Sequence, residues 1–111
     1  MNQKLSEYRI MWVLVFFDLP VGTAKERKAA SKFRIDLLKD GFSMFQFSIY
    51  ARHCNSRENM EVHRLRVRAL LPPRGFVCIA FFTDKQFGGM ELYHGGQSQK
   101  NRDGSQQLTL F

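Results

Sequence analysis

The sequence lacks the features that mark several large classes of protein. Its longest apolar run, residues 10–17, has eight residues, whereas a membrane-spanning helix needs about 20. Asp18, Leu19 and Pro20 follow this run in place of a small-residue cleavage site, so we expect no secretory signal peptide. The two cysteines lie 24 positions apart and outside any C-x-x-C motif, which indicates free thiols rather than a disulfide framework. We therefore expect a cytoplasmic protein with no membrane partner.

Common catalytic and cofactor motifs are missing as well. The chain has no P-loop, no G-x-G-x-x-G motif and no Ser-His-Asp order. His53, Cys54 and His63 lack a recognised zinc spacing. The hydrophobic fraction of 44% excludes a wholly disordered chain. A length of 111 residues suits one domain whose core needs neither a metal nor a disulfide.

Acidic residues are in the minority, and the imbalance is uneven along the chain. The sequence has 17 Lys and Arg against 10 Asp and Glu, a formal net charge of +7. Residues 1–82 carry 14 basic and 7 acidic side chains, whereas residues 83–111 carry 3 of each. A basic body with a neutral tail indicates a surface that binds a polyanion such as nucleic acid.

Four segments have the apolar patterns of β-strands. Residues 10–17 and 76–82 are apolar throughout, which is typical of strands buried on both faces. Residues 42–50 alternate between apolar and polar side chains, as a half-buried strand does. Residues 86–93 predict a weaker strand that is interrupted by two glycines.

Capping signals predict two helices. Thr23 opens a T-x-x-E capping box for the first helix, which should end at Gly41. Asn55 opens a similar signal for the second helix, which should end near Leu71, before two prolines. The apolar positions that should face the core are Ala30, Phe33 and Leu37 on the first helix and Val62, Leu65 and Ala69 on the second.

The order of these elements fits a ferredoxin-like α+β sandwich, β-α-β-β-α-β. That template needs two strands between the helices, although residues 42–54 carry no strong turn signal. We divide the chain into an N-terminal extension at 1–10, a ferredoxin-like domain at 11–94, and a final segment at 95–111. This final segment starts with a Gly-, Ser- and Gln-rich linker and closes with a short predicted strand at 106–111.

The predicted sandwich has consequences for assembly. Helices cover only one face of such a sheet, so the other face should expose Trp12 or Val13 and several phenylalanines. An apolar patch of that size on a small domain marks an interface. We therefore expect a homodimer that packs sheet on sheet, with the C-terminal strand added to the partner's sheet.

Basic side chains gather on one face of each predicted helix. We call these sets the lysine stripe and the arginine stripe and expect both to contact a nucleic-acid backbone. The lysine stripe comprises Lys25, Lys28, Lys32 and Lys39, and the arginine stripe comprises Arg57, Arg64 and Arg68.

Asp18 is the main candidate for catalysis, because it ends the first buried strand where the chain meets solvent. An alternative is that Asp18 only forms the turn before Leu-Pro. Mg²⁺ often takes just one or two carboxylates, so the two Asp18 side chains of a dimer could hold one ion that activates water for phosphodiester hydrolysis. Asp84 is a poorer partner, because antiparallel pairing would place it at the opposite edge of the sheet.

Two polar residues in the 42–50 segment leave alternatives open. Gln46 and Ser48 contact either phosphate or a dimer partner, or they are ordinary polar residues on a half-exposed strand.

Several segments, taken together and in order, resemble the CRISPR-associated protein two family, in the version found in type II systems. The resemblance covers the chain from about residue 11 to residue 111. It is carried by residues 12–20, 25–30, 40–50, 52–54, 56–58, 83–88 and 106–111.

The resemblance implies a prokaryotic, cytoplasmic, ferredoxin-like homodimer that serves CRISPR adaptation. Such a subunit bridges two dimers of the CRISPR integrase, and the complex captures a spacer-precursor DNA duplex and inserts it into the CRISPR array. The resemblance also implies a Mg²⁺-dependent endonuclease activity on RNA or DNA. A stand-alone ribonuclease toxin on the same fold remains an alternative.

The resemblance also assigns roles to individual residues. Asp18 matches the family's metal-binding and catalytic Asp at the end of the first strand. Arg27 matches its helix Arg, which we add to the nucleic-acid-binding candidates, and Gln46 and Ser48 match its Q-x-S element. The sequence departs from the family at Leu19-Pro20, where an Ile followed by polar residues is commoner.

Overall fold

The computed structural model describes residues 11–98. Two sequence predictions, the N-terminal extension at 1–10 and the strand at 106–111, lie outside these residues. The described part contains the predicted β-α-β-β-α-β order and confirms the ferredoxin-like fold. The six elements of that order are β1 (Met11–Asp18), α2 (Ala24–Lys39), β2 (Ser43–Gln46), β3 (Ile49–Cys54), α3 (Arg57–Ala69) and β4 (Phe76–Thr83).

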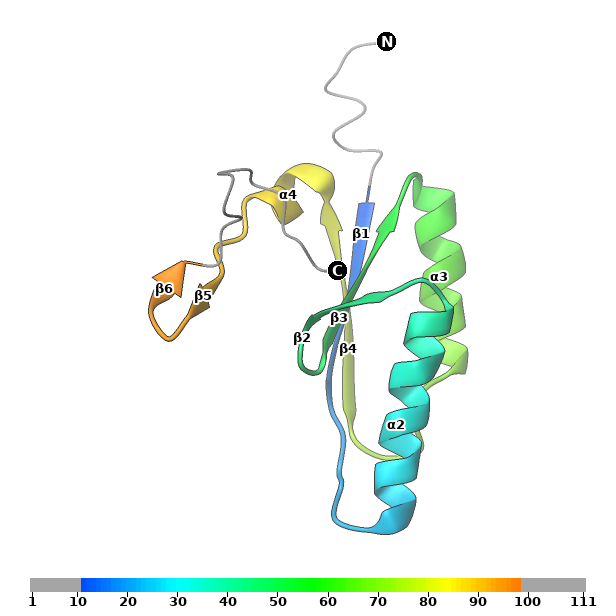
Figure 1. Ribbon diagram of the computed structural model, residues 1–111. Coiled ribbons are helices and arrows are strands. Elements are labelled where there is room, and N and C mark those ends of the chain that lie inside the picture. Colours follow the sequence, from blue (N-terminus) through cyan, green and yellow to red (C-terminus); the bar gives the residue numbers. More distant parts are fainter. Residues whose placement is uncertain (1–10, 99–111) are drawn as a thin grey trace.

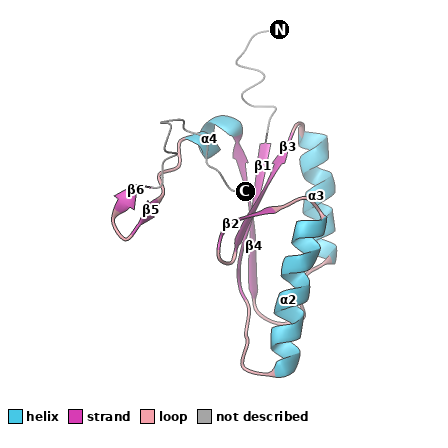
Figure 2. Cartoon of the chain, in the orientation of Figure 1, coloured by secondary structure: helices cyan, strands magenta, loops and turns pink. Residues whose placement is uncertain are grey.

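The four strands form one antiparallel sheet in the order β2-β3-β1-β4. Figure 1 shows α2 and α3 side by side on one face of this sheet, the helix face. The cartoon in Figure 2 shows the other side of the sheet, the open face, with much less cover. The two apolar strands β1 and β4 pair along their whole length, from Met11 opposite Thr83 to Asp18 opposite Phe76.

Helix α2 forms as its capping box predicts. The Thr23 hydroxyl accepts a hydrogen bond from the Glu26 backbone N–H, and the Glu26 carboxylate accepts one from the Thr23 N–H. Gly41 follows the helix with φ +90°, a conformation that suits glycine. The predicted core face is confirmed, because Ala30, Phe33 and Leu37 are all buried.

The predicted core face of α3 is wrong. Val62 and Leu65 are 42% and 51% exposed, and Ala69 is exposed as well. The helix turns Met60, His63 and Val67 into the core instead. His63 was not among the predicted core positions, but its imidazole has a buried partner on another element and therefore packs inside. The N-cap is also shifted by one residue, to Ser56, whose hydroxyl accepts from the Asn59 N–H.

The continuous strand predicted at residues 42–50 is also wrong at its centre. A tight turn at Phe47 and Ser48 divides the segment into β2 and β3. Ser48 adopts φ +70°, which is uncommon for a residue other than glycine, asparagine or aspartate. Because the turn contains no glycine, no sequence signal marked it.

A helix replaces the weak strand predicted at residues 86–93. Helix α4 (Asp84–Gly88) starts at a capping box in which Thr83 and Gln86 exchange hydrogen bonds. The hairpin of β5 (Tyr93–His94) and β6 (Gln97–Ser98) follows. Its second strand occupies part of the segment predicted as a linker at 95–105.

Two apolar clusters lie on the two faces of the sheet. The helix-face cluster includes Val13, Val15 and Phe17 of β1 together with Phe33 and Leu37 of α2. The open-face cluster comprises Trp12, Leu14, Ala51 and Phe87, with Phe16, Phe45, Ile49, Phe82 and Met90 packed against it.

The expected exposure of Trp12 or Val13 is therefore corrected. Val13 is fully buried beneath the helices. Trp12 is buried on the open face because Phe87 of α4 stacks on its indole, with ring centroids 3.9 Å apart. The open face exposes Phe76 and Cys78 of β4 instead, next to the end of β1. Across residues 11–98, no helix is long and apolar enough to cross a membrane.

Candidate active site and nucleic-acid surface

Asp18 lies where the sequence analysis placed it, exposed at the end of β1. Within residues 11–98 its carboxylate accepts no hydrogen bond and forms no ion pair. Strand alternation puts Asp18 on the open face, in line with Trp12, Leu14 and Phe16. Its neighbour across the β1–β4 pair is Phe76, which is 73% exposed.

The backbone around Asp18 is fixed by close contacts. Gly75 has φ +101°, and a Cβ atom at this position would lie 2.9 Å from the Asp18 carbonyl oxygen and 2.7 Å from Leu19 Cδ2. Only glycine fits there, so the loop before β4 can pack directly on the end of β1. Arg27 donates a hydrogen bond of 3.0 Å from Nη1 to the Val21 carbonyl, which holds the loop between β1 and α2.

A groove of about 340 Å³ opens beside this loop. Its walls come from the loop after Asp18, the first turns of α2 and the loop before β4. The lining residues are Leu19, Pro20, Thr23, Lys25, Glu26, Ala29, Ala30, Pro72, Pro73 and Arg74.

The Q-x-S element lies at the β2–β3 turn, beside the same end of β1. The Phe17 N–H donates a hydrogen bond of 3.0 Å to the Ser48 carbonyl oxygen. Ser48 is therefore held against the residue that precedes Asp18, whereas Gln46 is exposed at the end of β2. The structure thus brings Asp18 and Ser48 to one end of the sheet.

Among residues 11–98, Asp18 is the free carboxylate at this end of the sheet. No group of three or more His, Cys, Asp or Glu side chains that could hold a metal ion occurs in the described range. An exposed carboxylate without a protein partner nevertheless fits Mg²⁺, which keeps several water ligands and uses one or two carboxylates. Asp84 lies at the opposite end of the sheet, as expected, and its Oδ1 accepts a hydrogen bond of 2.8 Å from the Trp12 indole.

The two basic stripes lie on the helices and not beside Asp18 on the open face. Their side chains are exposed, except for Arg64, which is partly buried. Lys32 forms an ion pair of 2.7 Å with Asp36. Arg64 donates two hydrogen bonds to Glu61, which raise the pKa of Arg64 and lower the pKa of the Glu61 carboxyl. Lys25 differs from the other lysines because it lines the groove next to Asp18.

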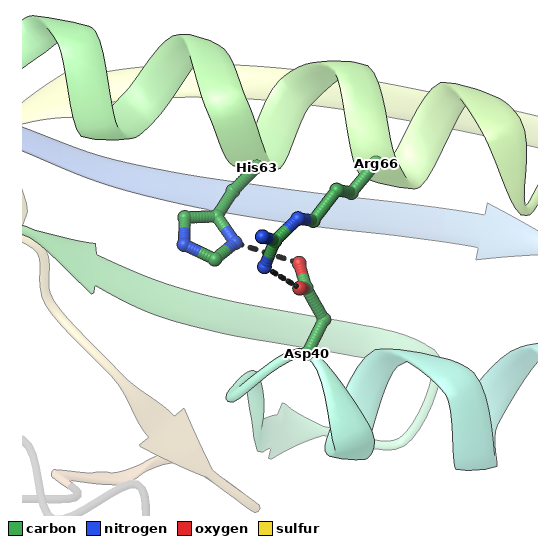
Figure 3. A network of polar contacts seen from close by, with 3 residues as sticks. All are labelled: Asp40, His63 and Arg66. Atoms are coloured by element: carbon green, nitrogen blue, oxygen red, sulfur yellow. Dashed lines mark hydrogen bonds and ion pairs between the residues drawn. The ribbon is translucent and has the colours of Figure 1, made fainter.

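A polar network with a buried Asp40–His63 pair joins α2 to α3 (Figure 3). Asp40, the C-cap residue of α2, lies 2.7 Å from His63 Nδ1 and 3.0 Å from Arg66 Nη1. The side chains of His63 and Asp40 are only 4% and 9% exposed. The sequence analysis missed this network because its partners lie 23 and 26 positions apart. Its role is structural, since it satisfies a buried imidazole.

The two cysteines are free thiols, as predicted. Cys78 is exposed on β4, and Cys54 is buried at the end of β3. Burial raises the pKa of the Cys54 thiol above its ordinary value of 9.0, although the neighbouring Arg52 guanidinium favours the thiolate. Cys54 therefore stays protonated and unreactive at neutral pH.

Known proteins match most of this chain. The family model for CRISPR associated protein Cas2 matches residues 11–90. A protein of Flavobacterium psychrophilum named CRISPR-associated endoribonuclease Cas2 is 58% identical over 108 residues, which cover 97% of this chain and 94% of the relative. A protein of Parvibaculum lavamentivorans with the same name is 50% identical over 101 residues, covering 91% of this chain and all of the relative.

A structural comparison supports the fold independently. A solved structure described as a crystal structure of Cas2 superposes with a TM-score of 0.55. It shares 20% sequence identity and covers 83% of this chain and 93% of its own. The sequence matches extend over nearly the whole chain, and the fold agrees with them. The chain is therefore a member of the CRISPR-associated Cas2 family.

Proposed function

We propose that this member of the Cas2 family is a Mg²⁺-dependent endonuclease that cleaves RNA or DNA, with Asp18 as its metal-binding catalytic residue. The observation that carries the proposal is the Asp18 carboxylate itself. It is exposed at the end of a rigid, buried strand, and no hydrogen bond or ion pair engages it in the part of the chain that the structure describes. Relatives named endoribonucleases support a nuclease activity in general.

The residues around Asp18 would position this chemistry. Asp18 would hold the ion, and Gly75 keeps the backbone beneath it closely packed. A bound Mg²⁺ supplies an activated water and neutralises charge on the scissile phosphate. Because Asp18 lies on the open face, a second copy that packs on that face would bring a second Asp18 near the first.

The activity is tested by substitution of the carboxylate. We expect the parent protein to cleave single-stranded RNA or duplex DNA in the presence of Mg²⁺, and we expect EDTA to abolish this cleavage. Asp18→Asn should lower the rate about 100-fold or more, because the amide is a poor ligand for Mg²⁺. Asp36→Asn, which changes the ion-paired carboxylate of Asp36 on α2, is the matched control and should cleave like the parent. Equal rates for parent and Asp18→Asn would rule out Asp18 as the active residue.

The homodimer belongs to the same proposal. Phe76 and Cys78 are exposed beside Asp18, while α4 already covers the Trp12 end of the open face. A second copy is the partner that would cover this remaining apolar surface symmetrically. Phe76→Ser should weaken self-association at least about tenfold in sedimentation experiments. Leu38→Ala, which changes an apolar residue exposed on α2, should leave self-association unchanged.

The adaptation role is the second part of the proposal. The lysine and arginine stripes lie on the helices, so they stay accessible in a dimer formed through the open faces. We infer that they bind the backbone of a spacer-precursor DNA duplex while the dimer bridges two integrase dimers. Each phosphate contact adds about 0.9 to the slope of log affinity against log salt.

This role is tested by salt titration. Lys28→Gln combined with Arg68→Gln should make the slope shallower by about one to two and should weaken all duplex sequences alike. Lys32→Gln serves as the control and should change the slope less, because Asp36 already neutralises the Lys32 charge. A duplex affinity that barely changes with salt would contradict the backbone contacts.

A further inference from the structure

An exposed aromatic ring lies at the β2–β3 turn, beside the proposed active site. Phe47 is 75% exposed, although it belongs to the two-residue turn between β2 and β3. The guanidinium carbon of Arg34, on α2, lies 4.9 Å from the Phe47 ring centroid and 5.6 Å from the Phe17 centroid. Arg34 therefore links this surface ring to a ring of the core.

The contact with Arg34 holds the ring in place but does not bury it. The Arg34 Nε atom is buried and has no hydrogen-bond partner among the described residues, so stacking on the two rings is its main compensation. Ser48, the next residue of the turn, adopts the uncommon φ of +70°. Unusual backbone conformations of this kind often occur at binding sites. The turn thus presents a fixed ring to solvent with no packing role for its outer side.

The turn lies at the end of β1 that carries Asp18. The hydrogen bond from the Phe17 N–H to the Ser48 carbonyl, 3.0 Å long, joins the two segments. Phe47 is the residue before Ser48, and Asp18 is the residue after Phe17. Phe47 contacts α2 on the helix face, whereas Phe76 lies on the open face. A dimer formed through the open face would therefore leave the Phe47 ring accessible.

We propose that Phe47, backed by Arg34, stacks on an unpaired base of a single-stranded nucleic acid and guides that strand to Asp18. This inference rests on the proposed nuclease function and adds a residue that positions its substrate. Single-strand-binding proteins combine basic side chains with aromatic rings that stack on bases. The bases of an intact duplex are stacked inside it and do not reach a surface ring, so the contact selects single strands.

The test measures binding without cleavage. An Asp18→Asn background in EDTA is titrated against a single-stranded RNA and a duplex of equal length. Phe47→Ala should weaken single-strand binding roughly 5- to 100-fold and change duplex binding less than about twofold. Phe47→Leu should behave like Phe47→Ala, because leucine keeps the apolar bulk but has no π face. Phe47→Trp should retain binding, and its introduced indole should lose fluorescence when the single strand binds.

Controls and contrary outcomes separate this inference from the nuclease proposal. Tyr93→Ala, which removes another exposed aromatic residue, should leave both affinities unchanged. Unchanged single-strand binding by Phe47→Ala, or an equal loss for single strand and duplex, would overturn the inference. Full binding by Phe47→Leu would indicate an apolar docking contact and would also overturn it. This experiment measures binding only, so its outcome does not depend on the nuclease activity. The cleavage assay with Asp18→Asn tests the nuclease proposal separately, and that proposal can fail while Phe47 still stacks on a base.

Discussion

Each end of β1 has an aspartate and a phenylalanine nearby, but the two ends differ in the contacts that these residues make. At the first end, Asp84 accepts a hydrogen bond from Trp12, and Phe87 stacks on the same indole. At the second end, Asp18 has no polar partner within residues 11–98, and Phe76 beside it is exposed. The first end is closed by internal contacts that stabilise the fold. The second end leaves the same two residue types exposed.

The largest expected effect is a difference in stability between variants of Phe87 and Phe76. Phe87→Ala should lower the free energy of unfolding by about 3 to 5 kcal/mol, because it removes a buried ring from the stack on Trp12. Phe76→Ala should change the stability of the monomer by less than about 0.5 kcal/mol. Urea titrations at low protein concentration measure both values. Similar losses for the two variants would show that the second end is packed as tightly as the first.

A second engaged aspartate, Asp40, should also matter for stability. Asp40→Ala leaves the buried His63 without its partner and should lower the free energy of unfolding by about 2 to 3 kcal/mol. The control is Asp36→Ala on the same helix, whose partner Lys32 is exposed, with an expected loss below about 0.5 kcal/mol. If Asp40→Ala were as mild as its control, the α2–α3 network would contribute nothing.

The hydrogen bond at the closed end has a smaller expected effect. Trp12→Phe keeps an aromatic ring under Phe87 but removes the donor to Asp84, so the free energy of unfolding should fall by about 1 to 2 kcal/mol. Tyr93→Phe removes an exposed hydrogen bond to Glu91 and should have no measurable effect. Thermal or urea unfolding distinguishes the two variants, and equal stability would weaken the contrast between the ends of β1.

The smallest expected effect is on how stability changes with pH, and it distinguishes the two cysteine thiols. The raised pKa of Cys54 means that the unfolded chain releases this proton at a lower pH than the native protein. Its contribution to stability is therefore complete below pH 9.0 and is lost as the pH rises above that value. Cys54→Ala should flatten the decline in stability between about pH 8 and pH 10, whereas Cys78→Ala should leave it unchanged. An identical decline in Cys54→Ala would contradict the burial effect.

Local signals were sufficient to predict much of the fold. The capping box at Thr23 and the glycine at Gly41 gave both ends of α2, because each acts through neighbours in sequence. Two apolar runs gave β1 and β4, and the end of the first run gave Asp18 as a candidate. The box at Thr83 was present in the sequence too, and it would have predicted α4 in place of a strand.

The remaining features depend on contacts between distant segments. His63 packs inside α3 only because Asp40 is available 23 residues earlier, so helical periodicity of apolar residues selected the wrong face. The turn at Ser48 depends on its bond to Phe17, 31 residues away, and not on a glycine. The Phe47–Arg34 contact likewise joins a turn to a helix and has no signature in sequence order.

The proposed activity depends on metal binding by the Asp18 carboxylate. Crystals of the parent grown with Mn²⁺ as a substitute for Mg²⁺ test it through anomalous scattering. We predict an anomalous peak within coordination distance of an Asp18 carboxylate oxygen, and its loss in Asp18→Asn crystals of the same form. A peak that persists in Asp18→Asn, or parent crystals with Mn²⁺ bound elsewhere and none at Asp18, would contradict the account.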